Sequence, residues 1–484
     1  MRINALTFKT LNGLQYIFDN NKGVVIPFSD EMSYILDNYD CSTREDLISN
    51  LKSSNNYSED YLYSVYDYIA LLLKKGMFCF DENSTLANRA LSYDDIYNNS
   101  TSQLILIVTE SCNMRCKYCV YSDHYPGLKS YSEKEMSEKT ALKAVDFYID
   151  IHKQKMEHGI YKEPTISFYG GEPFLKFDLI KKVIEYCKSK NFKASFNMTT
   201  NGTIISDEMI DFIIANKIVL TFSLDGPEDN HDRNRVLQDN TPTFDCVFEN
   251  LKKLQFAKKK HNVKIPLSIN VTFDMNTDME KVVEFFNDNY ELLSPYALNF
   301  NEVVKYGTTY YEGCDLKNSI LNKSLSSLTN KFLGMFNQSA EIPYALKTLF
   351  IPVKQINLRQ RFNKEQYNVC LPGGKFAISP DEKIYVCEKV TQSCAIGNLE
   401  TGISLEKMNN LYSKYTEIIN ENCKYCPVSR LCNMCYAQMV KDNHLEFSEE
   451  ACKSSLDSIK NSLTLAYTLL ENNERRFKDT FGNS

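Results

Sequence analysis

The sequence predicts an α/β protein whose centre is a parallel sheet with helices packed on its outside. Apolar segments alternate with amphipathic ones six times between residues 103 and 335, and such alternation indicates parallel strands. Glycine-rich and polar motifs directly follow the apolar segments, at the carboxyl ends of strands where these folds bind ligands. The expected strands are 104–109, 164–169, 194–199, 218–224, 265–272 and 297–303. The expected helices are 134–153, 174–189, 206–215, 243–260, 278–289 and 317–334.

Composition narrows the class of protein. The chain has 484 residues, 43% hydrophobic and 24% charged, which is typical of a soluble globular protein with several domains. Its net charge of -7 disfavours a nucleic-acid partner. No apolar run reaches the ~18 residues of a spanning helix, and the first residues lack the apolar core of a secretory signal. We therefore expect a cytoplasmic protein with no membrane segment, whose 16 cysteines serve metal or redox chemistry rather than disulfides.

Residues 1–95 are predicted to form a small separate domain with a winged-helix-like order of three strands followed by three helices. The expected strands are 5–9, 14–18 and 23–26, the expected helices are 29–38, 43–51 and 58–74, and a last strand is expected at 77–80. This domain is either a cap on the larger one or a module that binds a peptide as an added strand at its sheet edge. DNA binding is disfavoured because the segment is not basic. The polar segment 81–102 is predicted to be a linker.

The first cysteine motif is the loop Cys112-Asn-Met-Arg-Cys116-Lys-Tyr-Cys119, directly after the first expected strand. Three thiolates at this spacing can converge on one iron–sulfur cluster. A [4Fe–4S] cluster ordinarily takes four cysteines, so three leave one iron open to a small molecule. The alternatives are scattered core cysteines or zinc, although zinc loops usually have a two-residue gap and a second Cys or His pair.

Three further motifs follow strands. They are Tyr-Gly-Gly-Glu-Pro at 169–173, Thr-Thr-Asn-Gly-Thr at 199–203, and Ser-Leu-Asp-Gly-Pro at 223–227 with Arg235 beyond it. Glycine lets a ligand come close to the backbone, yet each motif alone is also typical of an ordinary turn. Asn270, inside the fifth strand, faces either a ligand or the barrel interior.

A second cysteine system lies between residues 370 and 455. Its members are Cys370, Cys387, Cys394, Cys423, Cys426, Cys432, Cys435 and Cys452. A hairpin of strands 375–379 and 383–386 is expected among them, with a long helix from 448 to about 477 after them. Paired cysteines of this kind indicate a metal site. Taken alone they fit structural zinc as well as iron–sulfur clusters. The other cysteines, Cys41, Cys79, Cys187, Cys246 and Cys314, are expected to be small core residues.

Taken together, these motifs resemble the radical S-adenosylmethionine (SAM) enzymes that carry a SPASM extension. The resemblance implies a partial (β/α)₆ barrel over residues 103–335, a bridging segment at 336–369 and a SPASM domain at 370–484. Two departures stand out. Only two residues separate Cys432 from Cys435 where the family usually has three, and Glu382 replaces the usual glycine of the hairpin turn.

The resemblance also implies three [4Fe–4S] clusters and SAM. Cys112, Cys116 and Cys119 would hold the first cluster, whose electron cleaves SAM to a 5′-deoxyadenosyl radical. The outer auxiliary cluster would take Cys423, Cys426, Cys432 and Cys452, and the inner one Cys370, Cys387 and Cys435. The last ligand of the inner cluster stays open between Cys394, water and a substrate thiolate. The implied SAM contacts, with Tyr118 on adenine and Arg235 on the carboxylate, are Tyr118, Gly170, Gly171, Glu172, Asn201, Ser223, Asp225 and Arg235.

The order of the N-terminal domain resembles the precursor-recognition module of radical enzymes that modify ribosomal peptides. The resemblance therefore implies a maturase that binds the leader of a ribosomally made precursor peptide. It would install an intramolecular thioether between a cysteine sulfur and a carbon, using an external electron donor such as flavodoxin or ferredoxin. The alternatives are carbon–carbon cross-linking, formylglycine formation in a sulfatase, and a non-catalytic peptide-binding or metal-sensing protein.

Overall fold

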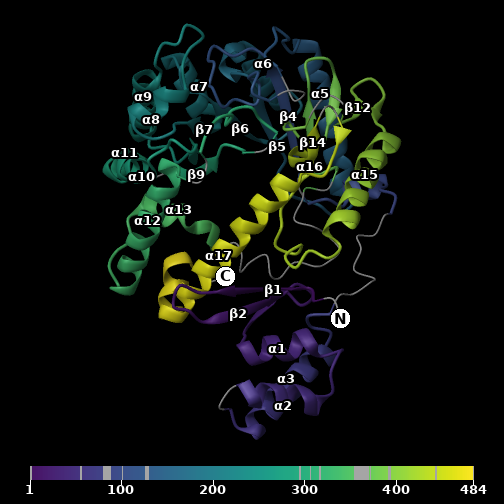
Figure 1. Cartoon of the computed structure of the whole chain (residues 1–484). Helices are drawn as coiled ribbons and strands as arrows, with labels where there is room; N and C mark the ends of the chain where they lie inside the picture. Colours follow the sequence, from purple (N-terminus) through teal and green to yellow (C-terminus); the bar gives the residue numbers. More distant parts are fainter. Residues whose placement is uncertain are drawn as a thin grey trace.

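The chain folds into a barrel-like parallel sheet covered by helices, and its N-terminal residues form a small separate domain. A long C-terminal helix reaches from the larger part toward that domain (Figure 1). The computed structural model describes residues 3–54, 57–79, 89–100, 102–125, 130–293, 296–305, 307–315, 318–353, 370, 372–390, 394–441 and 444–482. Of the bridging segment predicted at 336–369, residues 354–369 lie outside the described residues. Of the linker predicted at 81–102, residues 81–88 and residue 101 lie outside them.

The six predicted barrel strands are confirmed, and neighbouring strands pair in parallel in chain order. They are β4 (Gln103–Thr109), β5 (Thr165–Gly170), β6 (Ser195–Thr200), β7 (Val219–Ser223), β8 (Leu267–Phe273) and β9 (Tyr296–Glu302). All residues of β4 after the first are buried, as expected for a strand covered on both faces. The sheet and its helices share one hydrophobic core.

The helices that follow these strands are also close to the predicted positions. They are α5 (Glu138–Glu157), η1 (Pro173–Lys176) with α6 (Phe177–Ser189), α7 (Asp207–Asn216), α9 (Phe244–Lys260), α10 (Met279–Asp288) and α12 (Ile320–Asn337). Helix α5 begins four residues later than predicted. Glu135 instead pairs with Thr109 of β4, and Ser137 caps the helix by accepting from the Thr140 N–H.

The C-terminal hairpin extends the barrel sheet. Strand β10 (Lys375–Ile378) pairs in parallel with β4, and β11 (Lys383–Tyr385) pairs with β10. Two strands absent from the prediction, β12 (Ala395–Asn398) and β13 (Gly402–Ile403), complete the ten-stranded order β13-β12-β11-β10-β4-β5-β6-β7-β8-β9. The first cysteine loop, which follows β4, and Cys387, which follows β11, therefore lie at the ends of strands of one continuous sheet.

The backbone conformation of the hairpin turn explains why the family usually has a glycine at the position of Glu382. Glu382 has a φ of 63°, a conformation in which glycine is normally preferred. Its side chain accepts from Lys143 Nζ at 2.8 Å and from Thr140 Oγ1 at 3.3 Å, both on helix α5. These contacts compensate in part for the strained backbone and tie the hairpin to the barrel.

The N-terminal part has the predicted order and a core of its own. It comprises the antiparallel strands β1 (Ala5–Lys9), β2 (Gln15–Asp19) and β3 (Val24–Pro27), and the helices α1 (Asp30–Asn38), α2 (Arg44–Ser54) and α3 (Glu59–Lys74). The strand predicted at 77–80 is wrong over its described residues, where only an isolated bridge joins Cys79 to Ile3. Phe78 has a φ of 61°, which breaks an extended strand, and its N–H donates to Asp19.

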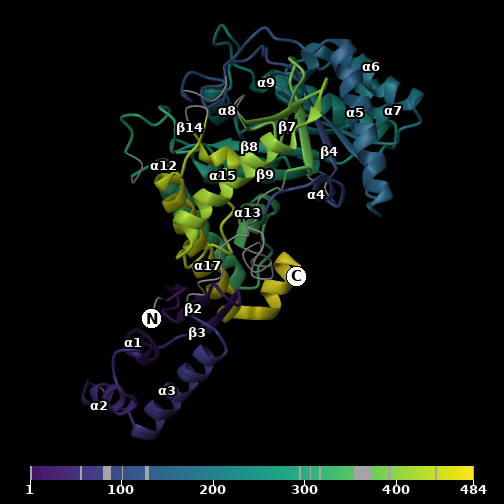
Figure 2. The ribbon, with the colours of Figure 1, turned by 90° about the vertical axis from the view of Figure 1, so that its right-hand side faces the viewer.

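Several further elements were not predicted. The described part of the expected linker contains helix α4 (Tyr93–Tyr97), whose Ile96 is buried in the barrel core, so this part is not a free linker. The others are α8 (Glu228–Asn234), α11 (Tyr290–Leu293), α13 (Tyr344–Leu349), α15 (Leu405–Cys423), α16 (Tyr436–Met439), β14 (Val440–Lys441) and β15 (His444–Leu445). The C-terminal helix α17 (Glu449–Phe481) has a kink at Asn473 and runs toward the N-terminal sheet (Figure 2). No described helix has the length and apolarity needed to cross a membrane.

A buried lysine fastens three of these parts together. Lys155 of α5 is 1% exposed, and its Nζ donates to the Asn99 carbonyl at 2.9 Å and to the Gly373 carbonyl at 3.3 Å. Burial lowers its pKa to about 8. The lysine thus joins the barrel to the end of α4 and to the segment that precedes β10.

We predict that Lys155→Met lowers the free energy of unfolding by about 2 kcal/mol, because two buried carbonyls lose their donor. Urea denaturation followed by circular dichroism measures this change. Lys153→Met, an exposed position on the same helix, is the matched control and should change stability by less than about 0.5 kcal/mol. Equal effects of the two variants would contradict the assignment.

Candidate active site

The first cysteine loop leaves the carboxyl end of β4 and is fixed by contacts from several strand ends. Cys112 Sγ accepts from the Met114 N–H at 3.4 Å and from Asn201 Nδ2 at 3.8 Å. The Cys112 carbonyl accepts from Arg115 Nη1 at 2.8 Å and from Gln238 Nε2 at 3.0 Å. The loop is therefore held in one conformation by residues that follow β4, β6 and β7.

The structure brings Cys112, Cys116 and Cys119 close enough for their thiols to influence one another. Burial, together with a smaller effect of the neighbouring thiols, raises the pKa of Cys112 to about 11 and that of Cys116 to about 12, while Arg235 opposes the shift. Buried thiols with such pKa values give up their protons readily only to a positively charged metal partner. This donor set fits an iron–sulfur cluster.

The glycine pair at the end of β5 lies against this loop. A Cβ on Gly170 would stand 2.0 Å from the Thr109 carbonyl oxygen, and one on Gly171 would stand 2.0 Å from that of Ser111. Gly170 also has a φ of 142°. Only residues without a side chain allow this close approach, so the pair is required for the backbone to reach the cysteine loop.

Glu172 is buried and fully engaged with protein donors. Its carboxylate accepts from the Asn201 N–H at 2.7 Å, from Thr200 Oγ1 at 2.9 Å and from the Phe174 N–H at 3.0 Å. Burial raises its pKa, and these donors oppose the rise. Glu172 therefore joins the ends of β5 and β6 and positions Asn201, whose side chain donates to Asn113 Oδ1 at 2.9 Å.

Tyr118, Asp225 and Arg235 form one cluster. The Tyr118 hydroxyl donates to Asp225 and accepts from Arg235 Nη1 at 2.9 Å, while Asp225 Oδ1 accepts from the Thr272 N–H at 2.9 Å. Arg235 is 5% exposed, and its buried Nε has no hydrogen-bond partner among the described residues. A buried guanidinium donor without a partner fits an anionic group such as the SAM carboxylate. Ser223 lies half-buried at the nearby end of β7.

A buried histidine holds this cluster from behind. The Asp225 N–H donates to His231 Nδ1 at 3.3 Å, His231 Nε2 lies 3.1 Å from Thr243 Oγ1, and that hydroxyl donates to the Arg235 carbonyl at 2.7 Å. Burial keeps the pKa of His231 well below its ordinary value, so the ring is neutral. These bonds require the tautomer with its proton on Nε2.

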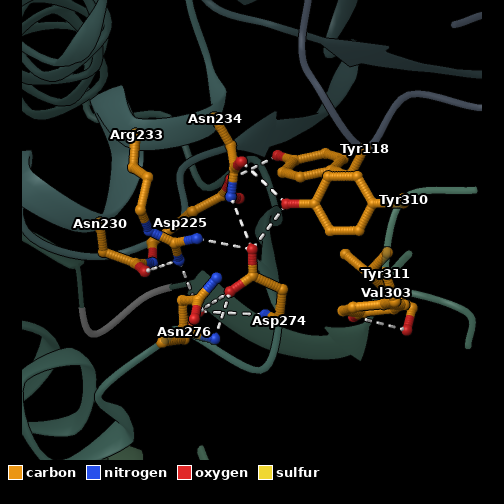
Figure 3. A network of polar contacts seen from close by, with 11 residues as sticks. Tyr118, Asp225, Asn230, Arg233, Asn234, Asp274, Asn276, Val303, Tyr310 and Tyr311 are labelled. Atoms are coloured by element: carbon orange, nitrogen blue, oxygen red, sulfur yellow. Dashed lines mark hydrogen bonds and ion pairs between the residues drawn. The ribbon is translucent and has the colours of Figure 1, made fainter. Parts of the chain in front are cut away.

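A second network, centred on Asp274, was not predicted (Figure 3). Its carboxylate accepts from Arg233 Nη1 and the Tyr310 hydroxyl, both at 2.6 Å, and from Asn234 Nδ2 at 3.1 Å. Burial alone would raise the pKa of Asp274, but these partners lower it to about 2. Asp274 directly follows β8, as Asp225 follows β7 after one leucine, and this recurrence was the sequence signal that could have found it.

A cavity of about 470 Å³ lies between the strand ends and the second cysteine system. Tyrosines of the first cysteine loop and of β5 line one side, and Thr272 and Glu302 come from β8 and β9. Residues of the C-terminal part close the other side: Glu388, Lys389, Cys435, Ala437, Gln438 and Val440. Both cysteine systems therefore border the same space.

Of the two groups predicted for the C-terminal cysteines, the described contacts bring the members of the first near one another. The thiols of Cys423, Cys426, Cys432 and Cys452 interact electrostatically with one another. Burial raises the pKa of Cys423 to about 12 and that of Cys426 to about 11.

In the other group, Cys370 and Cys435 both lie beside Tyr436, and Cys387 Sγ lies 3.1 Å from Glu388 Oε2. Cys394 is buried near Tyr385. No three described His, Cys, Asp or Glu side chains are placed to share a single metal ion. Thiols that bind different irons of a cluster need not lie so close, since each has its own metal.

Comparison with known proteins agrees with this geometry. Residues 106–285 match the model of the Radical SAM superfamily. The chain carries a radical SAM domain. Enzymes of this superfamily use a [4Fe–4S] cluster and SAM. The thiols of the first cysteine loop fit the cluster, and Arg235 Nε, which has no hydrogen-bond partner among the described residues, fits the SAM carboxylate.

Two relatives extend the similarity beyond the radical SAM domain. The chain is 24% identical over 363 residues to the radical SAM cyclopropyl synthase TigE of Paramaledivibacter caminithermalis, covering 72% of this chain and 71% of that protein. It is 23% identical over 352 residues to a cysteine-type anaerobic sulfatase-maturating enzyme of Clostridium perfringens, covering 68% of this chain and 87% of the relative. The solved structure of native anSMEcpe with bound AdoMet has the same fold, with a TM-score of 0.53 and 20% identity over 79% of this chain and 100% of that one.

Two sequence interpretations need correction or completion. Cys41, Cys246 and Cys314 are exposed, so they are not the core residues that were expected, whereas Cys187 is buried in the barrel core. Their helix faces or loops point away from the core, a property that the residue type alone does not reveal. Asn270 is half-buried, and its Oδ1 accepts from Asn299 Nδ2 at 3.3 Å across β8 and β9.

We predict that Glu172→Gln weakens SAM binding about tenfold and lowers the free energy of unfolding by about 2 kcal/mol, because an amide cannot accept from all three donors. Isothermal titration with SAM and urea denaturation measure the two effects. Glu163→Gln, in an exposed segment before β5, should change neither. Wild-type SAM affinity in Glu172→Gln would show that this carboxylate does not position the site.

Proposed function

We propose that this radical SAM enzyme is a maturase that acts on a ribosomally made peptide and joins a cysteine sulfur to a carbon of the same peptide. The observation that carries the proposal is the cavity, because it is bordered by the first cysteine loop on one side and by Cys435 and Glu388 on the other. A peptide segment in this space would meet a radical source and a second metal site at once.

The first part of the site would bind the cofactor. Cys112, Cys116 and Cys119 would hold a [4Fe–4S] cluster and SAM would complete it, supplying the one-electron chemistry that removes a hydrogen atom from substrate carbon. Arg235 would hold the SAM carboxylate through its Nε, and the Tyr118 ring, fixed by Asp225, would stack on adenine. Ser223, Asn201 and the backbone of Gly170 and Gly171 would complete the contacts.

The second part would hold two auxiliary clusters. The outer one would take Cys423, Cys426, Cys432 and Cys452, whose thiols lie together. The inner one would take Cys370, Cys387 and Cys435, which leaves one position for the substrate sulfur, for water or for Cys394. Four tyrosines line the opposite wall of the space between the two parts.

A thioether requires the substrate thiol to lose its proton, and the cavity offers an acceptor. The carboxylate of Glu388 lines the cavity and lies 3.1 Å from Cys387 Sγ. A substrate thiol next to the inner cysteine set would lie within reach of this carboxylate. One electron from an external protein such as flavodoxin or ferredoxin would cleave SAM, and the hydrogen atom from carbon would pass to 5′-deoxyadenosine. The proton from sulfur would pass to Glu388. The electron released when the carbon–sulfur bond forms would pass through the auxiliary metal site to the oxidised form of the external protein.

The N-terminal domain supports a peptide substrate. In the sheet order β1-β2-β3, strand β3 pairs with β2 and with no other strand of the described residues. A leader peptide could therefore add a strand there, since exposed strand edges bind extended peptides through backbone hydrogen bonds. This module would keep the rest of the precursor near the cavity at a high local concentration.

A second candidate function is formylglycine formation in a sulfatase. The similarity to a sulfatase-maturating enzyme, which covers 87% of that relative, favours this function. The similarity to a cyclopropyl synthase favours carbon–carbon bond formation as a further alternative. Deleting residues 1–90 separates the candidates. A leader-dependent maturase would no longer turn over its precursor after this deletion. A sulfatase maturase would still turn over its sulfatase substrate.

Mass spectrometry of a cysteine-containing precursor after anaerobic reaction tests the proposed bond. We predict a mass loss of two hydrogens, retained sulfur and one thiol fewer on alkylation. A control with the precursor cysteine changed to serine should not react. A product that keeps all its thiols would exclude the thioether, and a two-hydrogen loss in the serine control would favour carbon–carbon cross-linking.

Two cysteine variants separate the roles of the metal sites. Cys116→Ala should abolish formation of 5′-deoxyadenosine, because two thiolates do not retain the first cluster. Cys426→Ala should keep part of this activity and lose the peptide product. Liquid chromatography of 5′-deoxyadenosine and mass spectrometry of the peptide give both readings. Cofactor cleavage at the wild-type rate in both variants would show that the cluster assignments are wrong.

A further inference from the structure

The N-terminal sheet rests on the protein segments that carry the outer cysteine set. One buried apolar cluster joins Phe8 and Phe18 of the sheet to side chains of two C-terminal segments. Val428 and Leu431 come from the loop between Cys426 and Cys432, and Ile459 and Leu463 come from helix α17. The side chains of Cys426 and Cys432 themselves pack against this cluster.

Polar contacts fix the same loop to the turn between β2 and β3. Arg430 Nε donates to the Asn20 carbonyl at 3.1 Å, and Nη2 donates to the Asn21 carbonyl at 2.9 Å. The Arg430 N–H donates to Asn20 Oδ1 at 3.0 Å, and Asn20 Nδ2 donates to Ser429 Oγ at 2.9 Å. One loop thus both donates to and accepts from the N-terminal domain.

Helix α17 supplies the rest of the surface on which the N-terminal sheet packs (Figure 1). Thr464 Oγ1 donates to the Lys9 carbonyl at 3.1 Å, and the Leu11 N–H donates to Thr468 Oγ1 at 2.9 Å. The Tyr467 ring packs edge-on to that of Phe8 at 5.6 Å between centroids. The same helix carries Cys452, the fourth thiol of the outer set, in its first turn.

The loop that carries these contacts has no regular secondary structure of its own. Between Cys426 and Cys432 the chain makes only turns, with no helix or strand. A metal bound at both ends would close this short loop and reduce the entropy cost of holding Arg430, Val428 and Leu431 in place. The N-terminal domain has its own core around Ile35, Leu62 and Ile69, so it can leave the loop without unfolding.

We propose that the outer cysteine set is the platform on which the N-terminal domain docks, so that this domain is held in place only when the set carries its metal. The proposal rests on the ligand set given under Proposed function. It assigns a structural role to the outer site, which is to place the peptide-recognition module relative to the cavity. Loss of metal from this site would then release the module while the barrel and the first cysteine loop remain folded.

Hydrogen–deuterium exchange of the full-length, anaerobically reconstituted protein tests this without a peptide. Arg430→Ala removes both guanidinium contacts to the N-terminal domain but no thiol, so iron content should stay at the wild-type value. Exchange in β1 and in the turn 19–23 should become roughly tenfold faster. Cys426→Ala should lose iron and show the same faster exchange, while exchange in β5 and β6 stays unchanged.

Arg475→Ala, which removes an exposed guanidinium of α17, is the matched control and should leave exchange in β1 unchanged. Protection of β1 and the turn at the wild-type level in Arg430→Ala, or in a Cys426→Ala protein that has lost iron, overturns the docking proposal alone. A Cys426→Ala protein that keeps all its iron overturns the ligand set, and the docking proposal with it.

Discussion

The parallel pairing of β10 with β4 is the constraint on which the rest of the structure depends. Residues 375–378 pair with residues 103–106, so the C-terminal hairpin continues the barrel sheet rather than forming a separate unit. The first cysteine loop leaves β4, and Cys387 follows β11, two strands away in the same sheet. Because strands in a sheet are ~5 Å apart, this register sets how far the two cysteine systems stand from each other and creates the cavity between them.

Buried charged side chains hold the radical SAM site together at the ends of the barrel strands. Asp225, Glu172 and Arg235 are each 5% exposed or less, and buried charges are tolerated only when paired or hydrogen-bonded. Asp225 and Glu172 are satisfied within the protein, whereas Arg235 keeps one buried donor without a partner among the described residues. The protein thus supplies a fixed positive group next to the cysteine loop, already oriented by Tyr118 and by the neutral His231.

The local sequence predicted the strands and helices whose buried residues recur at a regular spacing. The six barrel strands and their helices were found because a buried parallel strand is continuously apolar and an outer helix is apolar on one face. Helix α15 was missed although it has the same one-sided apolar pattern, with Met408, Leu411 and Tyr415 buried. Strands β12 and β13 were missed because they are only 4 and 2 residues long. Asp274 was missed for another reason: its partners Arg233 and Tyr310 come from distant positions, and its one local signal was that it follows a strand, as Asp225 does.

The sequence by itself determined which chemistry the chain can support, because thiol spacing, a glycine pair and strand-end carboxylates are local properties. Only the tertiary structure decided that Glu172 faces protein donors, that Glu382 adopts a glycine-like φ supported by α5, and that the loop around Arg430 contacts the N-terminal sheet. Those outcomes depend on contacts between residues up to about four hundred positions apart. Such contacts arise from packing of whole elements, which no local pattern encodes.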